Sequence, residues 1–169
     1  AHYPKVILTP LGEVVFGSHG NDEYNSTHSF IIEPGGNDRY NESVAMSAGL
    51  LKSDSFWSRC YTAASFLIDI AGDDTYKGLN VAAAFGGAAV LIDCAGDDFF
   101  KTSSFSCGAA IFGIGALINL GGDDIYIGDT FCQGAGLFGI GLLADNTGND
   151  IYRAAKFAQG FGYTMGIGA

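Results

Sequence analysis

Apolar and polar positions alternate along the chain in short runs, and glycine-rich corners separate these runs. Clear examples are Ile125–Ile127, Thr130–Cys132 and the stretch from Leu137 to Leu143. Short β-branched and aromatic runs between Gly clusters predict β-strands. No window carries the helical period with caps, and each interior Gly would cost a helix roughly 1 kcal/mol. The pattern therefore predicts an all-β chain.

The strand pattern is repeated six times around a motif of Gly, Asn or Asp, Asp, one variable residue and an aromatic residue. The Asp residues at the second acidic position are Asp22, Asp38, Asp74, Asp98, Asp124 and Asp150. They follow one another at steps of 16, 36, 24, 26 and 26 residues. A fixed repeat indicates a fold in which each unit buries its apolar side against a copy of itself. We predict a parallel β-solenoid with coils of about 26 residues.

Departures from this period divide the single domain into three parts. Residues 1–40 contain the short step and are expected to form N-terminal capping coils. Residues 41–66 are expected to be an irregular insertion, with room for a short helix from Ser43 to Leu51, because the step that contains them exceeds the period by ten residues. Residues 67–169 are expected to form the regular repeats.

Composition and charge exclude several classes of protein. The chain is 48% apolar and only 15% charged, which argues against disorder. Its net charge of −10 and its lack of basic runs argue against nucleic acid as a partner. The longest uncharged stretch, between Lys101 and Asp123, is rich in Ser and Gly. We therefore expect no membrane span.

Cysteines and sequons bear on the cellular compartment. The four cysteines contain no Cys-x-x-Cys pair, so a structural zinc site is not expected. Two disulfides and buried free thiols both remain open. Asn25 and Asn41 begin Asn-x-Ser/Thr sequons, which are glycosylation acceptors in secreted chains. We expect an extracellular or cell-surface protein.

The paired acidic residues allow two interpretations. Gly-Asp-Asp could be corner chemistry alone, because Gly permits positive φ and Asp bonds to its own turn. Stacking, however, places equivalent carboxylates about 4.8 Å apart, where two charges repel by roughly 3.5 kcal/mol at an effective dielectric of 20. A packed ladder then needs a cation or raised pKa values. A further acidic column, five residues earlier, holds Asp69, Asp93, Asn119 and Asp145.

The segment from Gly17 to Tyr24, Gly-Ser-His-Gly-Asn-Asp-Glu-Tyr, resembles the RTX calcium-binding repeat. Gly35–Asp38 and Gly121–Asp124 resemble shortened versions of it. The resemblance implies Ca²⁺ held by Asp side chains and backbone carbonyls of neighbouring coils, in a secreted chain. RTX motifs recur every nine residues, whereas this motif recurs about every 26, so only stacking between coils could complete a site. The candidate metal ligands are Asp22, Asp38, Asp73, Asp74, Asp97, Asp98, Asp123, Asp124 and Asp150.

The predicted function is that of a secreted or cell-surface structural or adhesive module, stabilised by calcium. Solenoid ends carry unpaired strand edges, so we expect self-association of one end on the other, building a filament. Surface glycans are a further candidate partner. The alternative is a carbohydrate-active β-helix enzyme whose site lies near Trp57, Arg59 and Tyr61 in the insertion. The sequence assigns no catalytic residue.

Overall fold

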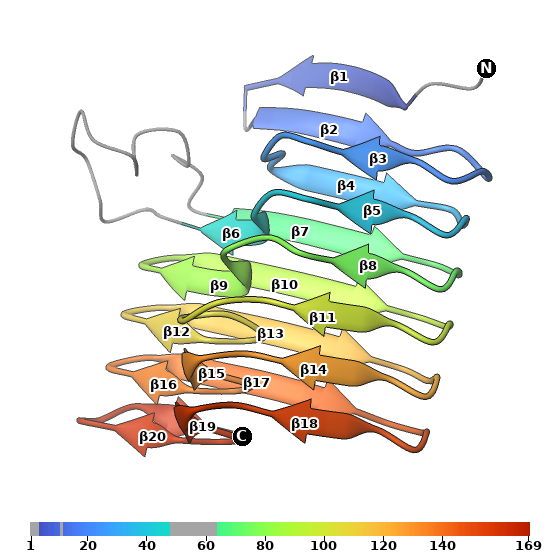
Figure 1. Ribbon diagram of the computed structural model, residues 1–169. Helices are drawn as coiled ribbons and strands as arrows, with labels where there is room; N and C mark the ends of the chain where they lie inside the picture. Colours follow the sequence, from blue (N-terminus) through green and yellow to red (C-terminus); the bar gives the residue numbers. More distant parts are fainter. Residues whose placement is uncertain (1–3, 11, 48–63) are drawn as a thin grey trace.

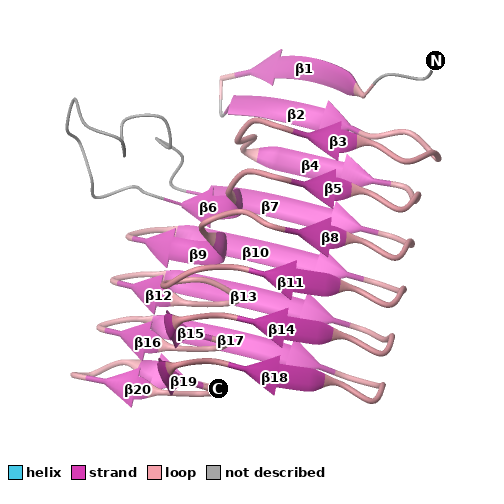
Figure 2. Cartoon of the chain, viewed as in Figure 1, coloured by secondary structure: helices cyan, strands magenta, loops and turns pink. Residues whose placement is uncertain are grey.

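A computed structural model describes residues 4–10, 12–47 and 64–169 of the chain. In these residues all regular structure is β, stacked into coils that form a parallel β-solenoid (Figures 1 and 2). The predicted fold class is confirmed, including the spacing of about 26 residues between equivalent strands. No helix in this part of the chain has the length and hydropathy needed to cross a bilayer.

An eight-stranded sheet, here called the long wall, runs the length of the solenoid. Its strands in spatial order are β1 (Lys5–Thr9), β2 (Gly12–Phe16), β4 (Phe30–Glu33), β7 (Ala64–Asp69), β10 (Ala88–Asp93), β13 (Ile114–Asn119), β17 (Ile140–Asp145) and β21 (Ile167–Gly168). All neighbours are parallel except β1 and β2. Register follows the repeat, with Leu91 paired to Leu117 and Leu117 to Leu143.

Two shorter sheets and one strand pair complete the coils. The six-stranded sheet, called the tyrosine wall, contains β3 (Glu23–Tyr24), β5 (Arg39–Tyr40), β8 (Thr75–Tyr76), β11 (Phe99–Lys101), β14 (Ile125–Ile127) and β18 (Ile151–Arg153). The five-stranded sheet, called the short wall, contains β6 (Val44–Ser47), β9 (Val81–Phe85), β12 (Ala110–Ile111), β16 (Gly136–Leu137) and β20 (Gly162–Tyr163). The remaining pair is β15 (Thr130–Cys132) with β19 (Lys156–Ala158).

Side chains from all three walls meet in the interior. Strand β7 alternates strictly, with Ser65, Leu67 and Asp69 buried and Phe66 and Ile68 exposed. The leucines at the position of Leu67 form one line of the core and pack with the inward aromatic residues of the tyrosine wall. Because successive strand residues point to opposite faces, the strands β4, β7, β10, β13 and β17 each end with a side chain directed into the solenoid.

The irregular coils have simple structural causes. Between Asp22 and Asp38 the chain passes from β3 to β4 and β5 without a strand in the short wall, which accounts for the 16-residue step. The ends of the 41–66 segment belong to the walls, since Val44–Ser47 is β6 and Ala64 begins β7. The helix expected from Ser43 is therefore wrong at residues 44–47. Residues 48–63, with Trp57, Arg59 and Tyr61, lie outside the described part of the chain.

The N-terminal edge of the long wall is formed by β1, which runs antiparallel to β2. A coil that adds to this edge would meet a strand of opposite direction from the rest of the wall. The head-to-tail association expected from the sequence stays a prediction.

Glycine at the sharp corners is required by the close approach of neighbouring coils. Gly72 and Gly96 have φ of 146° and 138°. A Cβ on Gly96 would lie 1.6 Å from the carbonyl oxygen of Gly72. No side chain fits there, so the Gly of the Gly-Asp-Asp motif is a packing requirement as well as a conformational one.

Candidate metal centre

The two acidic residues of each motif lie on opposite sides of the backbone. Asp74 and Tyr76 share the inward side, while Asp73 between Gly72 and Asp74 is exposed. The sequence grouped both residues as metal ligands, and the structure separates them into an inner and an outer ladder. The outer ladder consists of Asn21, Asn37, Asp73, Asp97, Asp123 and Asn149.

The outer ladder is a line of hydrogen bonds on the surface. The backbone N–H of Asp97 donates to Oδ1 of Asp73 over 3.0 Å, and that of Asp123 donates to Oδ1 of Asp97 over 2.8 Å. Each side chain thus caps the next coil. Asp73, Asp97 and Asp123 belong to none of the acidic groups that could hold an ion among the described residues.

The inner ladder bonds in the opposite direction. The backbone N–H of Asp38 donates to Oδ1 of Asp74 over 2.6 Å, and that of Asp74 donates to Oδ1 of Asp98 over 2.8 Å. The same bond joins Asp98 to Asp124 over 2.7 Å. Neighbouring carboxylates are therefore separated by a backbone N–H, which offsets part of the repulsion expected from stacking.

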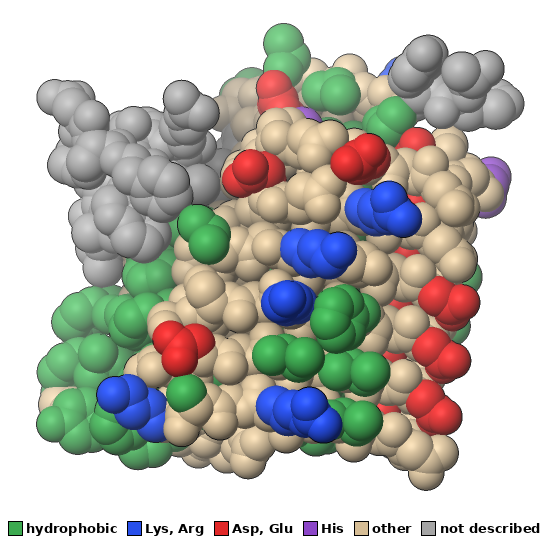
Figure 3. Space-filling model, viewed as in Figure 1, with side chains coloured by type: hydrophobic (Ala, Val, Ile, Leu, Met, Phe, Trp, Pro, Cys, Tyr) green, Lys and Arg blue, Asp and Glu red, His purple; other side chains and the backbone are tan. Residues whose placement is uncertain are grey.

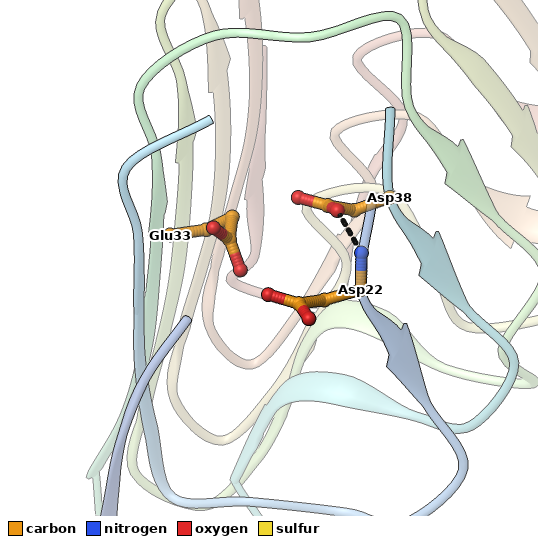
Figure 4. Close-up of side chains that lie close together, drawn as sticks. All are labelled: Asp22, Glu33 and Asp38. Atoms are coloured by element: carbon orange, nitrogen blue, oxygen red, sulfur yellow. Dashed lines mark hydrogen bonds between the residues drawn. The ribbon is translucent and has the colours of Figure 1, made fainter. Parts of the chain in front are cut away.

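A third column of side chains faces the inner ladder from the last residue of β4, β7, β10, β13 and β17. It consists of Glu33, Asp69, Asp93, Asn119 and Asp145. Four groups of three acidic residues result, with carboxylate oxygens within 4.8 Å of one another. They are Asp22, Glu33 and Asp38 (Figure 4); Asp38, Asp69 and Asp74; Asp74, Asp93 and Asp98; and Asp124, Asp145 and Asp150.

The two central groups contain buried oxygens without a hydrogen-bond partner. These oxygens are Asp38 Oδ2, Asp69 Oδ1, Asp74 Oδ2 and Asp93 Oδ1. Their four side chains are at most 1% exposed. A buried carboxylate oxygen with no donor is costly. These groups of buried acidic residues could therefore hold a metal ion.

Stacked aromatic rings line the groups on the side of the tyrosine wall. The rings of Tyr40, Tyr76, Phe100 and Tyr126 stack at centroid distances of 4.4 to 4.8 Å. The hydroxyls of Tyr40 and Tyr76 donate to the second oxygen of a long-wall carboxylate: Tyr40 to Asp69 Oδ2 and Tyr76 to Asp93 Oδ2, both over 2.7 Å. Each tyrosine thereby orients a carboxylate of the following coil and leaves its other oxygen directed into the group.

Burial changes the protonation of these carboxyls. Removal from water raises the pKa of Asp69, Asp74, Asp93 and Asp98, and neighbouring carboxylates raise those of Asp74 and Asp98 further. Burial raises the pKa of Glu33 to about 8. With no cation bound, the two central groups retain protons near neutral pH.

The interruption of the column occurs at Asn119. Its Nδ2 donates to Oδ2 of Asp124 over 2.8 Å and to the hydroxyl of Tyr126 over 3.0 Å. It also lies 3.4 Å from Oδ2 of Asp98. At this position amide protons thus reach carboxylate oxygens of Asp98 and Asp124, whereas several oxygens of the central groups have no donor. No acidic group of three forms between Asp98 and Asp124.

The ligand set predicted from the sequence omits the third column. Asp69, Asp93 and Asp145 are predicted only as a further acidic column, and Glu33 is absent from both predictions. Glu33 is fully buried in the first group, where its carboxylate accepts the hydroxyl of Tyr24. It stands five residues before Asp38, the same offset that separates Asp69 from Asp74. That offset was the available signal, although Glu33 is followed by Pro-Gly-Gly instead of the usual sequence.

The remaining sequence-based candidates lie away from these groups. Asn25 and Asn41 lie on the tyrosine wall side, and Nδ2 of Asn41 donates to Oδ1 of Asn25 over 2.9 Å. Cys94, Cys107 and Cys132 are free thiols. The fourth, Cys60, lies outside the described residues.

Comparison with protein-family models, curated proteins and solved structures found no match to this chain. The resemblance to the RTX repeat therefore stays a prediction. Function has to be inferred from the site, because a fold alone does not specify it.

Proposed function

We propose that the chain is a structural β-solenoid module of an extracellular or cell-surface protein, stabilised by Ca²⁺ in its buried carboxylate groups. The observation that supports this most directly is the set of four unpartnered, buried oxygens of Asp38, Asp69, Asp74 and Asp93. A cation that bridges two coils would neutralise charges that the fold has removed from water.

The ligand chemistry favours calcium over other metals. The groups contain only carboxylates, which are hard ligands, and neither Cys nor His. Ca²⁺ binds oxygen at about 2.3 to 2.6 Å, so two of its ligands lie at most about 5 Å apart. The oxygens of each group lie within 4.8 Å of one another, which suits this span. Mg²⁺ would require oxygens within about 4.2 Å and normally keeps several waters.

The structural role follows from where the groups lie. Each central group joins two coils, and Asp74 belongs to both groups. Ion binding would therefore couple the folding of consecutive coils, which in a solenoid contact only their neighbours. Contact with surface glycans and association through the solenoid ends stay predictions of this role. The alternative enzyme site lies outside the described residues and adds no support for catalysis.

The test is a thermal melt in EDTA and in millimolar Ca²⁺, at two protein concentrations, with Mg²⁺ at equal concentration as the control. Free Ca²⁺ at 100 times its Kd should add about 2.7 kcal/mol per site to the free energy of unfolding. We expect a clear rise in Tm with Ca²⁺ and a smaller one with Mg²⁺. An unchanged Tm, together with no Ca²⁺ retained after equilibrium dialysis, would leave the groups as proton-sharing carboxyls and overturn the proposal.

A further inference from the structure

The outer face of the long wall is apolar across six consecutive strands. Register assigns the outward positions of β2, β4, β7, β10, β13 and β17, and these carry only Gly, Ala, Val, Leu, Ile and Phe. The outward row nearest the acidic corner includes Ile32, Ile68, Ile92 and Ile118. Its members Ile32 and Ile68 are each 37% exposed, and Phe66 beside them is 38% exposed.

The outer face of the tyrosine wall carries charged side chains, unlike that of the long wall. Arg39, Lys77, Lys101 and Arg153 are exposed on it, and Figure 3, which looks onto this wall, shows basic side chains along its middle. The outer ladder Asp73, Asp97 and Asp123 lies at the corner where the long wall turns into the tyrosine wall. The long-wall face therefore has an uncharged centre with acidic side chains along one edge, which is the pattern of an interface core with a polar rim.

The size of this face is that of a protein interface. Six strands spaced about 4.8 Å apart, each four to six residues long, cover about 520 Å² of flat surface. This is in the upper part of the range, about 300 to 600 Å², of the largest apolar patch on a typical monomer. Two such faces in contact would bury about 1,000 Å², which is the smallest area expected of a specific interface.

We infer that this face binds the same face of a second copy of the chain, forming a dimer by contact between two long walls. Both faces repeat with the same spacing between coils, so their ladders can interdigitate as in packed sheets. The acidic edge decides the orientation. A two-fold axis parallel to the solenoid axis places the acidic edge of each copy opposite the uncharged edge of the other, whereas an axis along the strands would bring the two acidic edges together.

This dimer differs from association through the solenoid ends, because it leaves both ends open. It also does not depend on cation binding, since no ligand of the acidic groups faces outward from the long wall. The second copy is favoured over a lipid surface because the acidic edge would be repelled by anionic headgroups.

The test is sedimentation velocity across a concentration series, in EDTA and in Ca²⁺, for three chains. Wild type should be a dimer. Ile92→Lys, on the central strand β10 of the face, should weaken dimerisation by about 30-fold or more, because a charge then lies inside the buried interface. Ile125→Lys is the matched control, since Ile125 points outward from the tyrosine wall and should leave the dimer unchanged. Circular dichroism confirms that each variant is folded.

A second readout uses the wild-type chain alone. Cys94 follows β10 at the margin of the face and is partly exposed, so its alkylation should slow as the dimer forms. A wild-type chain that is monomeric at all concentrations would overturn the inference, whether or not it binds vesicles. An Ile92→Lys chain that associates as wild type does would place the contact elsewhere, at the ends for example, and would overturn it equally.

Discussion

The side-chain amide of Asn119 donates to Oδ2 of Asp124 over 2.8 Å. In the neighbouring coils the residue equivalent to Asn119 is itself a carboxylate. A second departure from the repeat accompanies it. Phe100 occupies the position of Tyr76 and Tyr126 in the aromatic stack, and it lacks the hydroxyl that would donate toward residue 119. The chain therefore loses a hydroxyl donor and a carboxylate acceptor together, which leaves neither partner unsatisfied.

Replacing Asn119 by Asp should create a fifth acidic group with Asp98 and Asp124. Without cation, the new buried carboxyl should lower the free energy of unfolding by about 2 kcal/mol or more. With Ca²⁺, it should bind one more ion per chain than wild type, as measured by equilibrium dialysis. Asn149→Asp on the exposed outer ladder is the control and should change neither quantity. An Asn119→Asp chain with unchanged Ca²⁺ stoichiometry would contradict the metal assignment.

Phe100→Tyr and Asn119→Asp should be coupled. Alone, Phe100→Tyr buries a hydroxyl opposite an amide whose protons already serve Asp124 and Tyr126, at a cost of about 1 kcal/mol. In the Asn119→Asp background the new tyrosine hydroxyl can donate to the carboxylate at position 119, as Tyr76 donates to Asp93. A double-mutant cycle by urea denaturation in EDTA should give a favourable coupling of about 1 to 2 kcal/mol. Additive effects would show that the two positions do not act as a pair.

Asp74→Asn should abolish ion binding in both central groups, because Asp74 belongs to each. Without Ca²⁺ its stability should equal or exceed that of wild type, since an amide satisfies these oxygens as Asn119 does. The rise in Tm on adding Ca²⁺ should then be largely lost. Asp97→Asn, an exposed residue of the outer ladder, should retain the full response. An equal Ca²⁺ response in both variants would exclude the inner ladder as the site.

The metal-free protein should become less stable as the pH rises. In the unfolded chain these carboxyls ionise near pH 4. In the fold, burial raises the pKa of Asp38 to about 6 and that of Glu33 to about 8. Between about pH 4 and about pH 8 the folded state binds more protons, so its stability is greatest at the acidic end and is lost toward pH 8.

This slope can be measured by thermal melts in EDTA at half-unit steps of pH. Saturating Ca²⁺ should flatten the slope, because bound ions replace the protons. A metal-free Tm that increases from pH 5 to pH 8 would mean that the carboxyls are ionised in the fold without compensation.

Gly96→Ala should be among the most destabilising small substitutions. Its Cβ would lie 1.6 Å from the carbonyl oxygen of Gly72, at a φ of 138°. We expect a loss of about 3 kcal/mol or more. Gly20 occupies the equivalent place in the first motif, where the nearest atom to a Cβ is 3.7 Å away. Gly20→Ala should therefore cost about 0.5 kcal/mol or less, and equal losses in urea denaturation would contradict the packing argument.

The repeat predicted the walls of the solenoid well because its period sets the strand register directly. Ile125–Ile127 and Thr130–Cys132 are strands with the predicted bounds. The run from Leu137 to Leu143 divides into two strands, since a corner falls at Phe138 and Gly139. Such corners are set by the packing of neighbouring coils, which no single coil specifies.

The candidate site was predicted in part. Strand periodicity could have assigned Asp74 to the inside, because it lies two residues from Tyr76, and Asp73 to the outside. The opposite hydrogen-bond directions of the two ladders depend on side-chain rotamers, which a spacing pattern does not contain. Likewise, Leu67 and Ile68 are both apolar, so hydropathy alone could not show that one is core and the other surface.

The hydrogen bond from Tyr76 to Asp93 joins one coil to the next. A deletion or duplication therefore preserves these contacts only when it removes or adds one full period. Both departures, Phe100 and Asn119, lie within one such period, since Phe99 pairs with Ile125. Loss of residues 100–125 in a single deletion would remove both and join Phe99 to Tyr126. Such a shortened chain would carry an acidic column without the interruption at Asn119. Recombination between repeats could therefore remove or restore this interruption while the coils keep their register.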